Sequence, residues 1–480
     1  MEVLKTIISG KGPGTMIRDR YAPMNLFDLV PLAAHFEPEL AQLDRLLDDD
    51  MLFGTVKADL ARRRPKSTQT GRPATPVEVV LRLLIVKHLY GWSYEETERF
   101  VSDSLVLRQF TRVYRAPVPD DTTLLRWANL ILPQTLHDLL DRVTQLAWQR
   151  KLTRGRKLRV DTTVVATHIH HPTDSSLLAD GVRVLSRVAR RARHLVRDAA
   201  AQPGALFRDR SRAATRLAHA ILDTTRRQGE EAATRRTGHY RRLLAVARAS
   251  LRQAEQVGKL LADGALPQAK RLRAQLEQFG PLLERVVSQA QRRVFAGEVV
   301  PADEKVLSLF EPETAVIRRG KLDRPTEFGA KLLLAEVEGG VVSRYVVLDG
   351  NPPDATELPG SLEQHQRQFT RAPDVLAGDR GFHTAANERA AEEAGVKHIA
   401  LPKPGAKSAK RQAHEQQGWF RRAGRFRAGI EGRISVLKRR FRLDRCRYHG
   451  RAGMERWVGW GIIAHDLLQI SRSTERRAAA

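Results

Sequence analysis

The sequence predicts a mixed α/β core that follows a helical N-terminal block and is interrupted by a long helical insertion. Three observations support this fold class. Short apolar runs rich in β-branched residues, typical of buried strands, occur at 158–167, 328–337, 341–348, 374–377 and 396–400. Between the first two runs the chain has a helical, arginine-rich pattern. After the insertion strands and helices alternate, which indicates one mixed sheet covered by helices.

The N-terminal part is expected to be helical. A helical pattern near 37–63 precedes a linker at 62–76 that contains Pro, Gly and basic residues. Apolar residues then recur at helical spacing from position 77 to 88, and Gly91 ends that helix. Ser93 and Glu96 form a capping box for the next helix. Candidate caps of the two helices after it are Asp103 or Ser104 and Asp121 or Thr122. Such short helices suggest a helix-turn-helix module, or else a bundle used for packing or dimerisation.

The remaining elements follow the first strand. Residues 169–178 are expected to return as a second strand, and 183–298 to be helical. Residues 181–300 hold 25 Lys and Arg against 10 Asp and Glu. Two later strands are joined by Glu338-Gly339-Gly340, a hairpin signal. The polar stretch 403–417 is expected to be a mobile loop, and the last 60 residues helical.

Composition limits the classes of function. Among 480 residues, 82 Lys and Arg face 55 Asp and Glu, which gives a formal charge of +27 and a pI near 10.8. This excess favours a polyanionic partner, nucleic acid above all. No long uncharged apolar stretch predicts a membrane span. The single cysteine, Cys446, excludes an intrachain disulfide and a cysteine-cluster metal site, and fits a reducing cytosol.

Two aspartates stand in or after predicted strands. Asp161 lies inside the apolar run KLRVDTTVV, where a carboxylate is costly to bury unless it is paired or binds metal. Asp379 follows the run VLAG, and ligands of open α/β sheets collect where such strands end. Hard cations such as Mg²⁺ take carboxylate ligands together with substrate phosphates. The alternatives are a solvent-facing acid on an edge strand for Asp161 and a turn cap for Asp379.

A third acid, Glu431, lies on a basic helix. Arg427 and Lys438 share its helix face, at four and seven residues' distance. An i,i+4 ion pair on a solvated face is the plain alternative. However, residues 403–451 hold 16 Lys and Arg and only three acids, so ion pairing does not account for the cluster. We expect it to follow a phosphate backbone.

The DTTVV run, the GDRGF segment and the R-x3-E-x6-K helix together resemble the DDE transposases of bacterial insertion sequences. LDGNPPDATEL and DSSLLADGVRVL are similar to the ISNCY-type group, and TPVEVVLRLLIVKHLYGWSYEETERFVSDSLVLRQFTRV to its helical N-terminal domain. The resemblance extends over nearly the whole chain. It implies an RNase H-like core in which Asp161, Asp379 and Glu431 are the catalytic, metal-binding acids. One departure is Gly424, where related enzymes often have Tyr.

The resemblance also implies cofactor and partners. Two Mg²⁺ ions, replaceable by Mn²⁺, would serve cleavage of transposon ends and joining of their 3′ ends to target DNA. The partners are double-stranded DNA, as terminal inverted repeats and target, and a second or further copy of the chain; no membrane is expected. The place of action would be the bacterial cytoplasm, at the nucleoid when DNA is bound. The expected DNA-binding residues are Arg380, Arg427, Arg433, Lys438, Arg439 and Arg440.

These considerations divide the chain into five parts. They are an N-terminal segment with linker (1–75), a helical DNA-binding domain of helix-turn-helix type (76–150), a catalytic core (151–182 and 301–450), a basic helical insertion (183–300) and a C-terminal helix with tail (451–480). The insertion is expected to clamp end DNA, or else to be a solvated structural hairpin. A derived DNA-binding protein without catalysis and a metal-dependent nuclease without strand transfer remain alternative functions.

Weaker candidates are set aside on local grounds. Three histidines follow the first strand, and we expect them in a polar hairpin rather than on a metal. These are His168, His170 and His171. Asp174, Asp349 and Asp354 lie near Pro or Gly and are expected in turns.

Overall fold

The computed structural model describes residues 36–62, 75–196, 206–262, 266–318 and 326–478. The segment 1–35 and most of the predicted linker, 63–74, lie outside the described residues. Contacts divide the chain into two units. The first combines residues up to 166 with those from 330 onward, and the second is 167–329. The predicted insertion, 183–300, lies within the second unit.

The first unit is built on a mixed sheet. Its order is β4-β3-β1-β5-β6, with β7 (Arg445–Cys446) paired to β1. The strands are β1 (Lys157–Thr167), β3 (Thr326–Val337), β4 (Val341–Val347), β5 (Val375–Ala377) and β6 (His398–Ala400). The hairpin β3–β4 is antiparallel, whereas β1, β5 and β6 run parallel. A hairpin on one side of β1 and parallel strands on the other is the arrangement of an RNase H-like core, as predicted.

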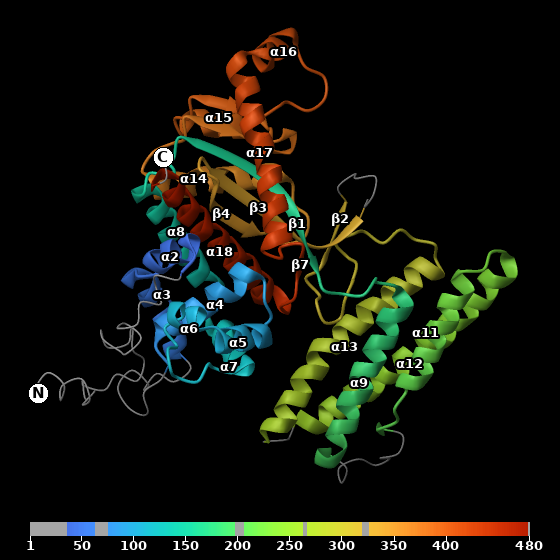
Figure 1. Ribbon diagram of the computed structural model, residues 1–480. Helices are drawn as coiled ribbons and strands as arrows, with labels where there is room; N and C mark the ends of the chain where they lie inside the picture. The colour runs from blue at the N-terminus through green and yellow to red at the C-terminus, as the bar shows by residue number, and fades with distance from the viewer. Residues whose placement is uncertain (1–35, 63–74, 197–205, 263–265, 319–325, 479–480) are drawn as a thin grey trace, which may run out of the picture. The chain divides into compact units, whose positions relative to one another are not determined.

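Helices surround this sheet. In the N-terminal block they are α2 (Pro38–Leu46), α3 (Asp50–Arg62), α4 (Val77–Tyr90), α5 (Tyr94–Asp103), α6 (Leu105–Phe110), α7 (Asp121–Leu130) and α8 (Pro133–Gln149). After β4 come α14 (Leu358–Phe369), α15 (Ala385–Glu393), α16 (Ala409–Gln416), α17 (Gly418–Arg440) and α18 (Gly450–Ala478). The long α18 packs against α2, α4, α8 and β4, so the N-terminal helices and the sheet share one hydrophobic core (Figure 1).

The helix ends follow local sequence signals. Gly91 takes a left-handed backbone conformation (φ 69°) and ends α4, as predicted. Ser93 and Glu96 form the predicted capping box of α5, and Ser104 caps α6. The cap of α7 is Asp120, one residue before the predicted candidates.

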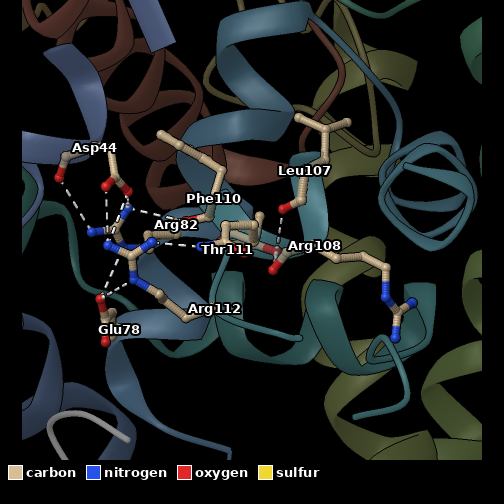
Figure 2. Close-up of polar contacts among 9 residues, drawn as sticks. Asp44, Glu78, Arg82, Leu107, Arg108, Phe110, Thr111 and Arg112 are labelled. Atoms are coloured by element: carbon tan, nitrogen blue, oxygen red, sulfur yellow. Dashed lines mark hydrogen bonds and ion pairs between the residues drawn. The ribbon is translucent and has the colours of Figure 1, made fainter. Parts of the chain in front are cut away.

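A buried ionic cluster joins α2 to α4. Arg82 is fully buried, and its guanidinium contacts Asp44 at 2.7 Å and Glu78 at 3.1 Å. Arg112 reaches the same two carboxylates at 3.0 and 3.2 Å (Figure 2). Two acids and two arginines neutralise one another, which is the condition for burying such charges. The cluster therefore fixes α2 and the end of α6 to α4.

The second unit is a helical bundle. Helices α9 (Asp174–Val196), α11 (Ser211–Thr225), α12 (Glu230–Ala262) and α13 (Pro267–Val294) pack around an apolar core of their own. In the same unit β2 (Ala315–Arg318) pairs antiparallel with the start of β3.

Two secondary-structure predictions were wrong, and a third, that the last 60 residues are helical, fails only between α17 and α18, where β7 lies. The strand expected at 169–178 is absent because α9 begins at Asp174, where the Thr173 hydroxyl accepts a hydrogen bond from Ser176 N. The loop expected at 403–417 contains α16, which the Ser408 side chain caps. In both places a short polar capping signal starts a helix that the surrounding composition conceals.

Candidate active site

Asp161 lies in the middle of β1 and is buried. Its Oδ1 accepts a hydrogen bond from Thr162 N at 2.7 Å. The other carboxylate oxygen, Oδ2, receives Arg427 Nη2 at 2.9 Å. The acid in the strand is therefore not a solvent-facing edge residue; it is held by one backbone group and paired with a cation.

Asp379 is brought beside it by the sheet. Strand β5 runs parallel to the start of β1, with Ala377 opposite Arg159, so the residue two positions after Ala377 stands next to Asp161 along the strands. Asp379 caps the short 3₁₀ helix Arg380–Phe382, its Oδ1 accepting from Gly381 N at 2.8 Å. Its Oδ2 lies 4.0 Å from Arg427 Nη2. Both aspartates thus bind backbone with Oδ1 and face the same guanidinium with Oδ2.

Glu431 completes the group from α17. Its Oε1 lies 2.9 Å from Arg427 Nη1, one helical turn away. The side chain is 64% exposed, against 9% for Asp161 and 34% for Asp379. Arg427 therefore contacts all three predicted acids at once, and its Nε is buried without a hydrogen-bond partner among the described residues.

Helix α17 is fixed against the sheet by a buried arginine. Arg159, two residues before Asp161, donates to Glu336 on β3 at 2.5 and 3.1 Å and to the carbonyl of Phe426 on α17. Gly429 leaves room for this guanidinium, because a Cβ there would collide with it. The positions of Arg427 and Glu431 therefore depend on a side chain of the same strand that carries Asp161.

A second anchor lies one turn further along α17. Arg433 reaches Glu336 at 3.4 Å and His465 of α18 at 2.8 Å, and His465 pairs with Asp466 at 2.7 Å. Burial lowers the pKa of His465 to about 3, so the ring is neutral. Arg433, predicted to bind DNA, thus points into the protein.

Sequence reasoning missed the place of Asp354. Its Oδ1 accepts from Lys331 Nζ at 2.6 Å and from Thr162 Oγ1 at 3.1 Å. A Cβ on Gly381 would stand 2.9 Å from Asp354 Oδ2 and 3.0 Å from Asp379 Oδ1. A fourth carboxylate, in the 3₁₀ helix Asp354–Glu357, thus lies close to that of Asp379 and contacts the residue after Asp161. Since the pairing spans 192 residues, no local signal could have found it.

The other predicted cations fall into two groups. Arg380, Arg439 and Arg440 are exposed, whereas Lys438 is half-buried. Further exposed arginines on α17 that were not singled out are Arg421, Arg422 and Arg425.

The weaker candidates have partners or exposed positions of their own. His168, His170 and His171 are exposed, and His170 faces Asp180 at 3.5 Å. Asp349 is exposed and pairs with Arg451. Asp174 was expected in a turn, but it begins α9 and binds Gln289 and Arg293.

The donor chemistry of the site fits a hard divalent cation. Oxygens of Asp161 and Asp379 face the Arg427 guanidinium, and Glu431 contacts its other nitrogen. Carboxylate oxygens of this kind are the ligands that Mg²⁺ takes. In the described part of the chain, no three or more His, Cys, Asp or Glu side chains form a closed metal-binding group. Arg427 stands between the two aspartates and Glu431. The residues therefore fit metal if the guanidinium moves aside.

Comparison with known proteins identifies the family. A family model described as a transposase domain (DUF772) matches residues 24–130, and one described as a transposase DDE domain matches 319–467. Together they cover just over half of the chain. The chain belongs to the DDE transposases of insertion elements. The DDE match contains Asp379 and Glu431, whereas Asp161 lies outside both matched ranges.

A curated relative is also similar in part. An uncharacterised protein of Rhizobium meliloti, ORF8 of the nfe locus, is 34% identical over 129 residues, which are 25% of this chain and 61% of that protein. The chain thus spans less than two thirds of this relative's length. No solved structure was found to match. Among the described residues, no helix has the length and apolar character that crossing a membrane requires.

Proposed function

We propose that this DDE transposase cuts the ends of an insertion element by metal-dependent phosphodiester hydrolysis and joins the freed 3′ ends to target DNA. The single observation that carries the proposal is the convergence of Asp161, Asp379 and Glu431 on one guanidinium. Acids from a strand, a strand end and a helix meet only in the folded chain. Since both aspartate oxygens face one nitrogen, they lie within reach of a pair of ions about 3.5–4 Å apart.

Asp161 and Asp379 would hold Mg²⁺ through their Oδ2 atoms, and Glu431 would help to hold a second ion; Mn²⁺ could replace either. When bound, such ions supply an activated water and neutralise charge on the leaving oxygen. Oδ1 of both aspartates accepts a backbone hydrogen bond, and Oδ2 of both already faces a positive group, the Arg427 guanidinium.

Arg427 has two roles in this proposal. Without DNA it neutralises three carboxylates that would otherwise repel one another. With DNA and metal bound, its planar guanidinium would turn to a phosphate of the strand being cut. Arg380, Arg439 and Arg440, together with Lys438, would bind neighbouring phosphates.

The helical insertion would add a second DNA surface. On α9 exposed arginines recur at 183, 187, 190 and 191, which is the spacing of one helix face. The opposite face supplies buried apolar residues to the bundle. A stripe of charge on a rigid helix suits a phosphate backbone, so we propose that the bundle clamps terminal repeat DNA. The N-terminal helices are proposed to contribute to end binding, and two or more copies to act together on DNA in the cytoplasm.

An assay with labelled terminal DNA, target DNA and Mg²⁺ tests the function. Joined products are expected from the wild-type protein, and neither cutting nor joining from Asp161→Asn, Asp379→Asn or Glu431→Gln. DNA binding by these variants should remain. Cut but unjoined products would indicate a nuclease, and a shift without cutting a binding protein; either result contradicts the proposal.

A further inference from the structure

A cavity of about 430 Å³ opens within the first unit, away from the carboxylates. It lies between the helices α4, α5 and α7 and the segment that leads into α18. Four aromatic rings line it, Trp92, Tyr94, Tyr448 and Trp457. Four cationic side chains line it as well, Lys87, Arg442, Arg447 and Arg456. Among the described residues no Asp or Glu does, so the charged side chains of the lining are all basic.

Lys87 is the unusual member of this lining. The residue is 3% exposed, and its Nζ stands 4.6 Å from the ring centre of Tyr94, 5.3 Å from Tyr448 and 5.5 Å from Trp457. Its Nζ has no hydrogen bond or ion pair to another described side chain, and the favourable interactions of the charged amine are those with the rings and, at longer range, with Glu96. Burial, with Arg447 nearby, lowers its pKa to about 7. A buried amine without an acceptor is costly, which points to an acceptor from outside the chain.

The rings and the rim are held in place. Tyr94 and Tyr448 share a hydrogen bond of 2.6 Å between their hydroxyls, and the Tyr448 hydroxyl lies 3.3 Å from His88 Nε2. At the rim Arg456 donates to Asn129 at 3.3 Å, while its Nε is buried without a partner among the described residues. The cavity therefore offers fixed aromatic faces and unused donors.

We propose that this cavity binds a nucleotide whose base is unpaired, with the base against the aromatic rings, Lys87 donating to an acceptor on the base edge, and the rim arginines on the phosphate. Stacking on aromatic side chains combined with cationic groups is how proteins hold unstacked nucleotides. Taking a base out of a duplex costs a few kcal/mol, least where it is already unpaired. A cavity of this size is ample for one nucleotide.

The source of the nucleotide is either a DNA strand or a free mononucleotide. The first source rests on the proposed function, because it assumes that the chain handles DNA. The cavity itself is independent of the proposed function, since none of its lining residues belongs to the proposed metal site. Its binding can therefore be measured without metal and without cutting.

Binding of the full-length protein is measured in EDTA to two DNA duplexes, one fully paired and one with a single unpaired 2-aminopurine. The wild type is expected to bind the unpaired duplex at least about tenfold more tightly, the typical effect of one or two hydrogen bonds, and to quench its fluorescence. Lys87→Met and Arg447→Gln should lose most of this preference. Arg389→Gln, an exposed arginine on α15 outside the lining, should keep it.

The outcomes separate the possibilities. If dAMP, at a concentration similar to that of the unpaired duplex, displaces this duplex from the wild type but not from Lys87→Met, the cavity binds a free nucleotide. If dAMP does not displace the duplex, the cavity binds a DNA strand. Equal binding of both duplexes by the wild type, or an unchanged preference in both variants, overturns the proposal. Arg447 is exposed, so its variant tests the cavity even if Lys87→Met misfolds. Glu431→Gln should keep the preference while losing cleavage, which distinguishes failure of this inference from failure of the proposed function.

Discussion

Arg427 Nη2 lies 2.9 Å from Asp161 Oδ2, across 266 residues of sequence. The same nitrogen stands 4.0 Å from Asp379, and its neighbour Nη1 stands 2.9 Å from Glu431. The arginine thus occupies the position of the cations that the proposed chemistry requires. In the proposed function it keeps the three acids together before metal and DNA arrive, and metal binding would displace it.

Replacing Arg427 by alanine should therefore change metal binding and catalysis in opposite directions. Without DNA, Mn²⁺ should bind about tenfold more tightly, because a competing cation has been removed from the carboxylates. DNA cleavage should fall by at least about tenfold, because a phosphate loses a bidentate donor. Calorimetric Mn²⁺ titration and single-turnover cleavage measure the two effects. Arg389→Ala, at an exposed arginine on α15 outside the site, is the control; weaker Mn²⁺ binding by Arg427→Ala would contradict this role.

Asp354 is expected to position the site without touching DNA. Asp354→Asn keeps the shape but removes the charge opposite Lys331 and weakens the contact to Thr162. Loss of such supporting contacts typically costs about 10- to 100-fold in activity or metal affinity. We expect kcat to fall while KM for DNA is unchanged, with partial rescue at high Mg²⁺. Asp349→Asn, at an exposed carboxylate, should behave like the wild type, and an Asp354→Asn enzyme of normal kcat would refute the positioning role.

Lys87→Met should stabilise the protein at neutral pH. The folded pKa of Lys87, about 7, lies below its unfolded value of 10.5. Below pH 7 both states are charged, so burial of the charge costs the folded state in full. Between pH 7 and 10.5 this free-energy cost decreases by about 1.4 kcal/mol per pH unit. The gain in unfolding free energy from Lys87→Met should thus be largest at pH 7 and small near pH 10. Denaturant titrations at pH 7 and 9.5 measure it, and a gain independent of pH would contradict the assignment.

The arginine face of α9 should bind DNA through charge. Arg187→Glu with Arg191→Glu is expected to weaken end-DNA binding by more than about tenfold and to reduce the slope of log affinity against log salt by about two. The matched variant Arg187→Lys with Arg191→Lys keeps the charges and should bind almost normally. Filter binding between 50 and 300 mM salt provides both numbers. Unchanged affinity of the Glu variant would leave the bundle with a structural role only.

Local signals carried most of what sequence could predict. Gly91, Ser93 and Ser104 set helix ends because capping depends on neighbours in the chain. The strands around Asp161 and before Asp379 were predictable from their apolar runs. The start of α9 was predicted to be a strand, because the sequence there has a strand-like composition, but a capping residue begins a helix instead.

What could not be predicted depends on tertiary pairing. Periodicity in 77–88 predicted one apolar face, whereas α4 is buried on nearly every side, including Arg82 and Lys87. Their partners, Asp44 and the rings around Lys87, come from other elements. Arg433 was expected on the DNA surface because it stands in a basic run. Its inward contact with Glu336 appears only once β3 lies beside α17.

The most direct measurement is the anomalous signal of Mn²⁺ in crystals of the protein bound to terminal DNA. We expect ions bound by the Oδ2 atoms of Asp161 and Asp379, with Glu431 near the second ion and Arg427 turned from the carboxylates to a phosphate. Absence of Mn²⁺ from these carboxylates beside a scissile phosphate, with Arg427 still between them, would contradict the account.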